Sequence, residues 1–193
     1  MIYAMPYRTP DPGNPRVQST RDRILAAARE LLAETGPAGL TYSLLADRAG
    51  VTRQTLYRHW PARSGLLVDL ILEGPDGGYP EPGADPAMVA AEWLASLRAG
   101  MRDPARRAAV LAVTAQADTD PDSAQALAQL MTDRLAAFND LLKPSGTQVT
   151  AEEYTVLSGP VLARVFFDRA EITDEFIASV VEHWLAATPK APA

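Results

Sequence analysis

Apolar residues recur at helical spacing in the first part of the chain, between a pair of hydroxyl residues and a Gly-Pro pair. Ser19 or Thr20 can cap the start of a helix, because a hydroxyl oxygen accepts a hydrogen bond from a free backbone N–H of the first turn. Gly36-Pro37 ends the pattern. The spacing predicts an amphipathic helix of about four turns, whose inner face is formed by Ile24, Ala27, Ala28, Leu31 and Leu32.

An aspartate followed by a proline occurs three times in the second part of the chain. The aspartate offers an N-cap acceptor, and proline is favoured at the first helical position because its missing N–H is not needed there. Each pair therefore predicts a helix start. The pairs are Asp85-Pro86, Asp103-Pro104 and Asp120-Pro121.

Two further helix starts follow towards the C-terminus. Thr150 with Glu153 forms a possible capping box, and Thr173 is followed by two acids that suit a positive helix end. No segment alternates as a strand does, so the sequence predicts an all-α fold. The clearest apolar stripe in this part consists of Leu127, Leu130, Met131, Leu135, Phe138, Leu141 and Leu142.

Proline and glycine mark the predicted domain boundaries. Residues 1–18 are rich in proline and polar groups, which predicts a flexible N-terminal arm. Residues 74–83 hold four glycines and three prolines, a composition that neither helix nor strand tolerates. We therefore predict one domain over residues 19–73 and a second helical domain over residues 84–188.

Residues 40–60 read as a helix-turn-helix. Thr41 can cap a short helix whose inward side is predicted to be Leu44, Leu45 and Ala49. Gly50 stands where the chain must turn sharply, and we expect a positive φ there because glycine adopts it at least cost. The small Ala46 suits a close helix crossing, and Val51 is expected to fill the space under the turn.

A second short helix follows the turn. Thr52 can cap it, with Thr55 and Leu56 facing inward and Arg53, Gln54 and Tyr57 facing outward. Its N-terminus presents free N–H groups and a positive dipole end to phosphate, and the major groove admits such a helix. We predict that this helix reads double-stranded DNA.

The side chains of this segment divide by chemistry into two predicted roles. Arg53 can form two parallel bonds to guanine and Gln54 to adenine, so both are candidates for base reading. Arg58 is left open between base and phosphate. The alternative is a helical hairpin, acting as a protein–protein interaction module, that does not touch DNA. The predicted phosphate contacts are Thr41, Thr52, Tyr57, His59 and Arg63.

Charge is unevenly distributed along the chain. Residues 16–63 hold eight arginines against four acids, whereas residues 74–193 hold nine basic and seventeen acidic groups. The net charge of −6 therefore conceals a basic first segment. Cysteine is absent and only two histidines occur, so we expect no metal and no cofactor. No apolar run is long enough to span a membrane, and we expect a cytoplasmic protein.

The motifs from Ile24 to about Leu72 resemble those of the TetR family of bacterial transcriptional regulators. The resemblance rests on the first helix, the turn around Gly50, the helix ending in an aromatic-X-His-aromatic pattern, and the helix opening that follows it. Trp60 stands where the family usually has Phe, and Arg63 where it usually has Lys. The resemblance implies a three-helix DNA-binding head followed by a helical ligand-binding and dimerisation domain.

The family likeness also implies a mechanism. A homodimer would bind a palindromic operator, most often as a repressor, and a small molecule would release it; the apolar composition of the expected pocket favours a largely apolar ligand. An activator is not distinguished from a repressor. No Ser/His/Asp or Cys/His set is present, so we predict no enzyme activity. Predicted ligand-lining residues, each of which could instead be ordinary core, are Trp93, Leu97, Met101, Leu111, Thr114, Phe138 and Tyr154.

The last two predicted helices resemble the dimerisation helices of one family subtype. Pro160 is expected to bend its helix, because it removes one helical N–H. The candidate dimer contacts could equally pack inside one protomer, an alternative that the residues leave open. They are Leu157, Val161, Val165, Phe176, Val180 and Trp184.

Overall fold

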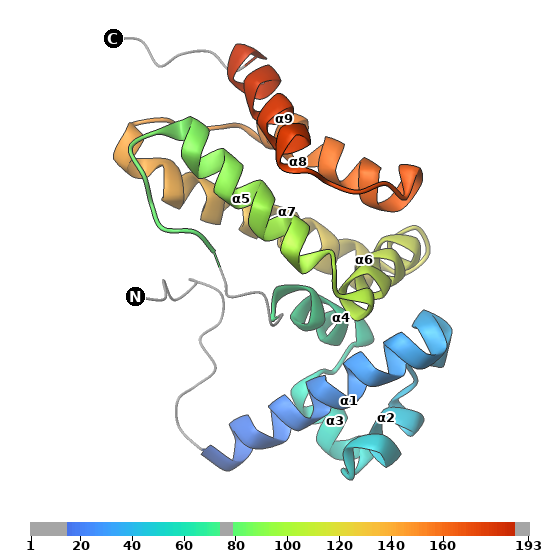
Figure 1. The fold of residues 1–193 in the computed structure, drawn as a ribbon. Coiled ribbons are helices and arrows are strands. Elements are labelled where there is room, and N and C mark those ends of the chain that lie inside the picture. The colour runs from blue at the N-terminus through green and yellow to red at the C-terminus, as the bar shows by residue number, and fades with distance from the viewer. Residues whose placement is uncertain (1–14, 74–78, 188–193) are drawn as a thin grey trace. The chain divides into compact units, whose positions relative to one another are not determined.

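The computed structural model describes residues 15–73 and 79–187, and the regular structure in these ranges is entirely helical. The predicted all-α fold is thereby confirmed. The expected arm lies almost wholly outside the described residues, as does half of the Gly/Pro-rich loop. The helices are α1 (Pro15–Gly39), α2 (Tyr42–Ala49), α3 (Arg53–His59), α4 (Arg63–Leu72), α5 (Pro86–Gly100), α6 (Pro104–Ala117), α7 (Pro121–Leu142), α8 (Ala151–Ala163) and α9 (Asp174–Ala187) (Figure 1).

The first helix differs from its prediction at both ends. α1 begins at Pro15, so Ser19 and Thr20 lie within it rather than at its cap. At Gly36 the backbone leaves helical geometry, with φ 68° and ψ −173°, and a last helical turn follows. A positive φ is inexpensive for glycine, so Gly36 kinks the helix where the sequence predicted its end.

The predicted caps in the second part of the chain are confirmed. Asp85 and Asp103 accept hydrogen bonds from the N–H two residues on, both at 2.9 Å. Asp120 accepts from the Ser123 N–H at 3.0 Å. Thr150 and Glu153 form the complete capping box. Local polar chemistry therefore sets these helix starts, as the sequence indicated.

The described helices belong to two packed units. One contains residues 15–73 and 102–130, and the other residues 79–101 and 131–187. The predicted second domain, residues 84–188, thus contributes helices to both units, and α7 is shared between them. Within the first unit α6 packs against α1 and α4, because its alanines leave room for close approach. The ion pair between Arg29 and Asp103, at 3.0 Å, joins α1 to the start of α6.

The second unit is built from α5, the C-terminal half of α7, α8 and α9. Contacts join α5 to α8 and α9, and α8 to α9. Arg98 on α5 pairs with Asp174 at the start of α9 at 2.6 Å. A π-helix, Arg164–Asp168, continues directly from α8. The largest buried side chains of this unit are Trp93, Phe138 and Trp184.

Two residues predicted to face inward are exposed, so these predictions were wrong. Leu44 is 48% exposed, because each helical residue turns the chain by about 100° and Leu45, Ala46 and Ala49 occupy the buried side of α2. Met131 is 39% exposed. It lies where α7 passes from one packed unit to the other. Among the described residues no helix is long and apolar enough to cross a membrane.

Candidate nucleic-acid interface

The predicted helix-turn-helix is present as α2, a tight turn and α3. The Thr41 hydroxyl caps α2 by accepting from the Leu44 N–H at 3.3 Å. Gly50 has φ 63° and ψ 41°, the left-handed conformation that the turn requires. The Val51 N–H then donates to the Ala46 carbonyl at 3.0 Å. Thr52 caps α3 by accepting from the Thr55 N–H at 3.2 Å.

The two sides of α3 differ sharply in burial. Leu56 is fully buried and Trp60, at the C-terminal end of the helix, is 3% exposed. Arg53, Gln54 and Arg58 are exposed. Tyr57 is 55% exposed. The inner side is fixed to the core, which leaves the outer side as a polar and cationic face on a rigid element. We call the side chains of Arg53, Gln54, Tyr57 and Arg58 the outer face of α3.

The arginines of the first unit fall into two groups. Arg48 pairs with Glu34 at 2.7 Å and Arg29 with Asp103 at 3.0 Å. By contrast, Arg53 and Arg58 form no ion pair or side-chain hydrogen bond within the described parts of the chain. The positive charge of the outer face of α3 is therefore uncompensated by neighbouring carboxylates and is available to an external anion.

A polar network ties the end of α3 to α1 and α4. The Trp60 indole Nε1–H donates to Asp69 at 2.6 Å. Arg21 on α1 donates to the same carboxylate at 2.7 Å and to Glu73 at 2.5 Å. The Arg21 guanidinium carbon also lies 5.6 Å from the Trp60 ring centroid. We call Arg21, Trp60, Asp69 and Glu73 the α1–α4 network. A phenylalanine in place of Trp60 has no N–H for this bond.

Tyr42 supports α3 from α2. Its hydroxyl donates to the Trp60 carbonyl at 2.7 Å, and its ring meets the Tyr57 ring edge-on at a centroid distance of 4.9 Å. Burial, with a smaller contribution from Tyr57 and an opposing one from Arg63, raises the pKa of Tyr42 to about 12. Tyr42 therefore remains a protonated donor to the end of α3 at neutral pH.

The side chains predicted to contact phosphate differ in their exposure to solvent. Thr41 and Thr52 are exposed. Arg63 is half-buried and donates to the Pro37 carbonyl. Burial, opposed by Tyr42, lowers the pKa of Arg63. Burial, together with the charges of Arg58 and Arg21, lowers the pKa of His59 from 6.5, so the imidazole is neutral at pH 7. Thus Arg63 points inward here, whereas both threonines are accessible.

The structure brings together most of the predicted ligand-lining residues but not all. Five of them are buried in the second unit. Leu111, 46% exposed, and Thr114, also exposed, lie on α6 in the first unit. The rings of Trp93, Phe138 and Tyr154 form one cluster, with centroid distances of 5.2–6.1 Å. The five buried residues are Trp93, Leu97, Met101, Phe138 and Tyr154.

The predicted dimer contacts are mostly inside the single chain. Leu157, Val161 and Trp184 are fully buried, and Val180 is 8% exposed. Val165 and Phe176 are half-buried. Their burial matches the alternative in which these side chains pack within one protomer. The exposed apolar residues of this region are instead Val156, Phe167 and Leu185.

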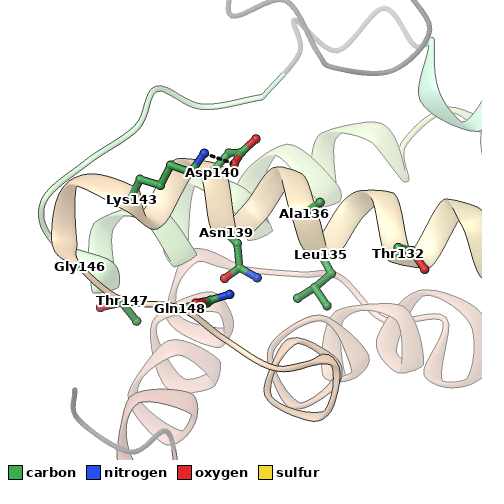
Figure 2. Close-up of a pocket in the computed structure, with 9 residues that line it drawn as sticks. All are labelled: Thr132, Leu135, Ala136, Asn139, Asp140, Lys143, Gly146, Thr147 and Gln148. Atoms are coloured by element: carbon green, nitrogen blue, oxygen red, sulfur yellow. Dashed lines mark ion pairs between the residues drawn. The ribbon is translucent and has the colours of Figure 1, made fainter. Parts of the chain in front are cut away.

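A separate hollow of about 580 Å³ opens beside the C-terminal half of α7. Figure 2 shows Leu135 and Asn139 pointing from α7 towards Gln148, while the Lys143–Asp140 ion pair lies on the other side of the helix. The Asn139 amide donates to the Val149 carbonyl at 3.0 Å and accepts from the Val149 N–H at 2.8 Å. None of the predicted ligand residues lines this hollow. The described residues also contain no group of three acidic or histidine side chains placed to hold a metal.

Sequence reasoning missed the residues that hold α3 in place. Arg21 and Asp69 are 48 positions apart, and nothing in their local sequence pairs them. The one available signal was the spacing of Asp69 and Glu73, which are one helical turn apart and so share a face of α4.

Comparison of sequences places the first unit among known regulators. The model of the tetR family of bacterial regulatory proteins matches residues 24–70. The HTH-type transcriptional regulator YdeS of Bacillus subtilis is 34% identical over 70 residues, which are 36% of this chain and 35% of YdeS. The nucleoid occlusion factor SlmA of Aliivibrio fischeri is 40% identical over 58 residues, 30% of each chain. The matches thus span about a third of these relatives.

Solved structures extend the likeness to most of the chain. A TetR family transcription regulator, SCO0332, is 26% identical with a TM-score of 0.66, covering 89% of this chain and 100% of that one. A TetR regulator from Rhodococcus sp. RHA1 shares the fold at 22% identity and a TM-score of 0.60, covering 90% and 99%. The helix-turn-helix with its exposed cationic face, the family match over residues 24–70 and the shared fold along both units agree with a TetR family regulator.

Proposed function

We propose that this protein is a cytoplasmic transcriptional regulator that acts as a repressor. A homodimer binds a palindromic operator and reads its DNA through the outer face of α3. A small molecule that binds in the second unit releases the protein from the operator. The observation that carries the proposal is that the guanidinium groups of Arg53 and Arg58 on α3 form no ion pair with any described residue. Arg53 and Gln54 lie in its first turn, directly after the Thr52 cap. Helix-turn-helix proteins contact base edges with the N-terminal residues of this helix.

The roles of the other side chains follow from their positions. Thr41 and Thr52 are exposed and can donate to phosphate, which fixes register without reading sequence. Arg58 lies in the last turn of α3, farther from the base edges, and we assign it to phosphate. We assign Arg63 and His59 to supporting α3 and not to contacting DNA. Arg63 donates to the Pro37 carbonyl, and His59 is a neutral, partly buried ring.

A titration against genomic fragments tests the proposal. Fragments upstream of the gene itself and of its neighbour are offered at several salt concentrations in a gel-shift assay. We expect one fragment to bind in preference, with log K falling linearly with log salt as phosphate contacts release counterions. Failure to bind any fragment at low salt supports the alternative of a helical protein–protein interaction module.

Dimerisation is proposed to occur through α8 and α9, which pack side by side (Figure 1). The exposed side chains Val156, Phe167 and Leu185 are apolar surface on or next to these helices, and Phe167 is 84% exposed. Contiguous exposed apolar surface marks interaction sites, and the proposal requires these three side chains to lie on one face. The buried Leu157 and Trp184 then support the interface from inside the protomer.

Sedimentation velocity tests the dimer surface. Phe167→Asp places a charge on this surface and is expected to shift the protein from dimer to monomer at micromolar concentration. Leu111→Asp, which charges an exposed apolar position on α6, is the matched control and leaves the dimer intact. A wild-type protein that is monomeric at every concentration contradicts the proposed mode of operator binding.

A further inference from the structure

One ring of the aromatic cluster in the second unit differs from the others. Tyr79 stacks parallel on Trp93, with a centroid distance of 4.7 Å and an angle of 7° between the planes. Phe138 and Tyr154 meet Trp93 at 47° and 70°. Inclined and offset-parallel ring pairs both occur in packed cores. The parallel Tyr79 ring shows that the face of the Trp93 indole accepts a flat ring, which is how a planar aromatic ligand would lie on it.

Of these four rings, Tyr79 is the least buried, and it alone lies outside a helix. Trp93, Phe138 and Tyr154 belong to helices and are at most 3% exposed. Tyr79 is half-buried and lies in the non-helical segment that precedes α5. That segment is joined to α7 by a backbone bond from Gly83 to Leu141 at 3.1 Å. Because no helical hydrogen bonds fix its backbone, the Tyr79 ring can leave Trp93 without breaking a helix.

A positive charge stands beside the stack. The guanidinium carbon of Arg134, on α7, lies 5.1 Å from the Trp93 ring centroid and 5.9 Å from that of Tyr79. A carboxylate attached to a ring in the place of the Tyr79 ring would lie within reach of this guanidinium, because an aryl carboxylate extends a few ångströms beyond its ring. Arginine forms strong, charge-assisted bonds with such a group.

The indole of Trp93 offers a further, unused contact. Its Nε1–H is buried and meets no hydrogen-bond acceptor among the described residues, although the side chain is only 1% exposed. Buried N–H groups are nearly always satisfied in folded proteins, and an unsatisfied one calls for an explanation. Tyr79 covers the ring face but supplies no acceptor. A ligand oxygen at the ring edge would satisfy the N–H.

We propose that Trp93, Arg134, Phe138 and Tyr154 form the effector site, that the Tyr79 ring closes it from within the chain, and that it takes planar aromatic carboxylates that displace Tyr79. Naming the occupant an effector rests on the proposed function; the binding itself does not. The ligand class is narrower than the largely apolar molecule expected from composition. The flat ring is required by Trp93 and the anionic group by Arg134.

Calorimetric titration of the full-length protein with 4-hydroxybenzoate tests the displacement. If Tyr79 must leave before the ligand binds, the apparent affinity equals the affinity of the open site multiplied by the fraction of molecules in which the site is open. We expect Tyr79→Ala to bind the probe at least about tenfold more tightly than wild type. Leu44→Ala, which removes an exposed apolar side chain from α2, is the matched control and leaves the affinity unchanged. The proposal is overturned if Tyr79→Ala binds no more tightly than wild type or not at all.

The same titration with the neutral 4-hydroxybenzamide tests the charge. In Tyr79→Ala we expect the carboxylate to bind about tenfold better than the amide, as one charge-assisted contact allows. Adding Arg134→Gln should bring the two affinities together, whereas adding Arg102→Gln at an exposed position on the other unit should not. An unchanged preference in the Arg134 variant removes Arg134 from the site, and circular dichroism confirms that each variant remains helical.

The two proposals fail separately. DNA binding is measured without any probe, so its failure contradicts the proposed function and leaves the calorimetric result standing. If 4-hydroxybenzoate binds Tyr79→Ala as expected but does not weaken its operator binding, the aromatic site is not an effector site, and the inference is overturned while α3 keeps its role.

Discussion

The outer face of α3 and the α1–α4 network both carry arginines, but they use them differently. Arg21 reaches two carboxylates at 2.5–2.7 Å and lies against the Trp60 ring. Arg53 and Arg58 reach none among the described residues. The same side chain therefore stabilises the fold in one place and remains available for a partner in the other. Arg21, Arg29 and Arg48 are paired with carboxylates, whereas the outer face of α3 carries two arginines without such a partner among the described residues.

The largest expected effect is on stability and concerns the α1–α4 network. Arg21→Met keeps the aliphatic stem but leaves Asp69 half-buried with only the Trp60 N–H as partner. We expect a loss of about 2–3 kcal/mol in the free energy of unfolding, because hydrogen bonds to charged groups away from water are strong. Urea denaturation measures it.

The neighbouring Arg23 supplies the matched control. It is exposed, and within the described ranges it forms no ion pair, so Arg23→Met should change stability by less than about 0.5 kcal/mol. Equal effects of the two substitutions contradict the stabilising role of the network.

A smaller effect is expected from Trp60→Phe. The ring remains, but the hydrogen bond from the indole N–H to Asp69 is lost. We expect a loss of about 1–2 kcal/mol in stability, since the acceptor is a charged group. Operator affinity should fall less than for a substitution on the outer face of α3. The double variant with Arg21→Met should lose less than the sum, because both act on Asp69; strict additivity speaks against a shared network.

Arg58→Ala sharpens the distinction within the outer face of α3. As a phosphate contact, Arg58 should contribute about 1 kcal/mol to binding of every DNA sequence, and its removal should reduce the slope of log K against log salt by about 1. Gel-shift titrations on operator and random DNA measure both quantities. A loss confined to the operator, with the salt slope unchanged, assigns Arg58 to a base instead.

The smallest expected effect is a pH dependence at His59. Because its pKa is lowered in the folded protein, the folded state binds fewer protons than the unfolded state, whose histidine titrates near 6.5. The stability from the neutral ring is complete above pH 6.5 and declines as the pH falls towards the lower, folded-state pKa. Wild type should therefore lose more stability between pH 7.5 and 5 than His59→Gln, as urea denaturation shows; parallel losses contradict the shift.

The features of this molecule that depend on neighbouring residues could be predicted from the sequence. Thr41, Thr52 and Asp85 were identified as caps because a cap needs only an acceptor and the N–H groups two or three residues on. Gly50 was identified because a sharp turn between helices needs a left-handed residue. The exposed positions of Arg53 and Gln54 followed from the helical spacing around Leu56.

The features that depend on distant residues could not be predicted. Leu44 was expected inside because it is apolar, but the packing of Leu45 and Ala49 against other helices decides which side of α2 is buried. Arg63 turns towards the Pro37 carbonyl, 26 positions away. Similarly, the apolar spacing of Leu157 and Trp184 fits a dimer contact and a protomer core equally well, and only the positions of α5 and α9 place them in the core.

The most direct test of the account compares wild type, Arg53→Ala and Arg102→Ala on one operator and on copies altered at single base pairs. We predict that Arg53→Ala loses about 1–3 kcal/mol on the operator. Alteration of the one base pair per half-site that Arg53 reads should weaken DNA binding by wild type and by Arg102→Ala, but it should not further weaken binding by Arg53→Ala. If every alteration weakens all three proteins equally, Arg53 does not read a base, and the assignment of the outer face of α3 is contradicted.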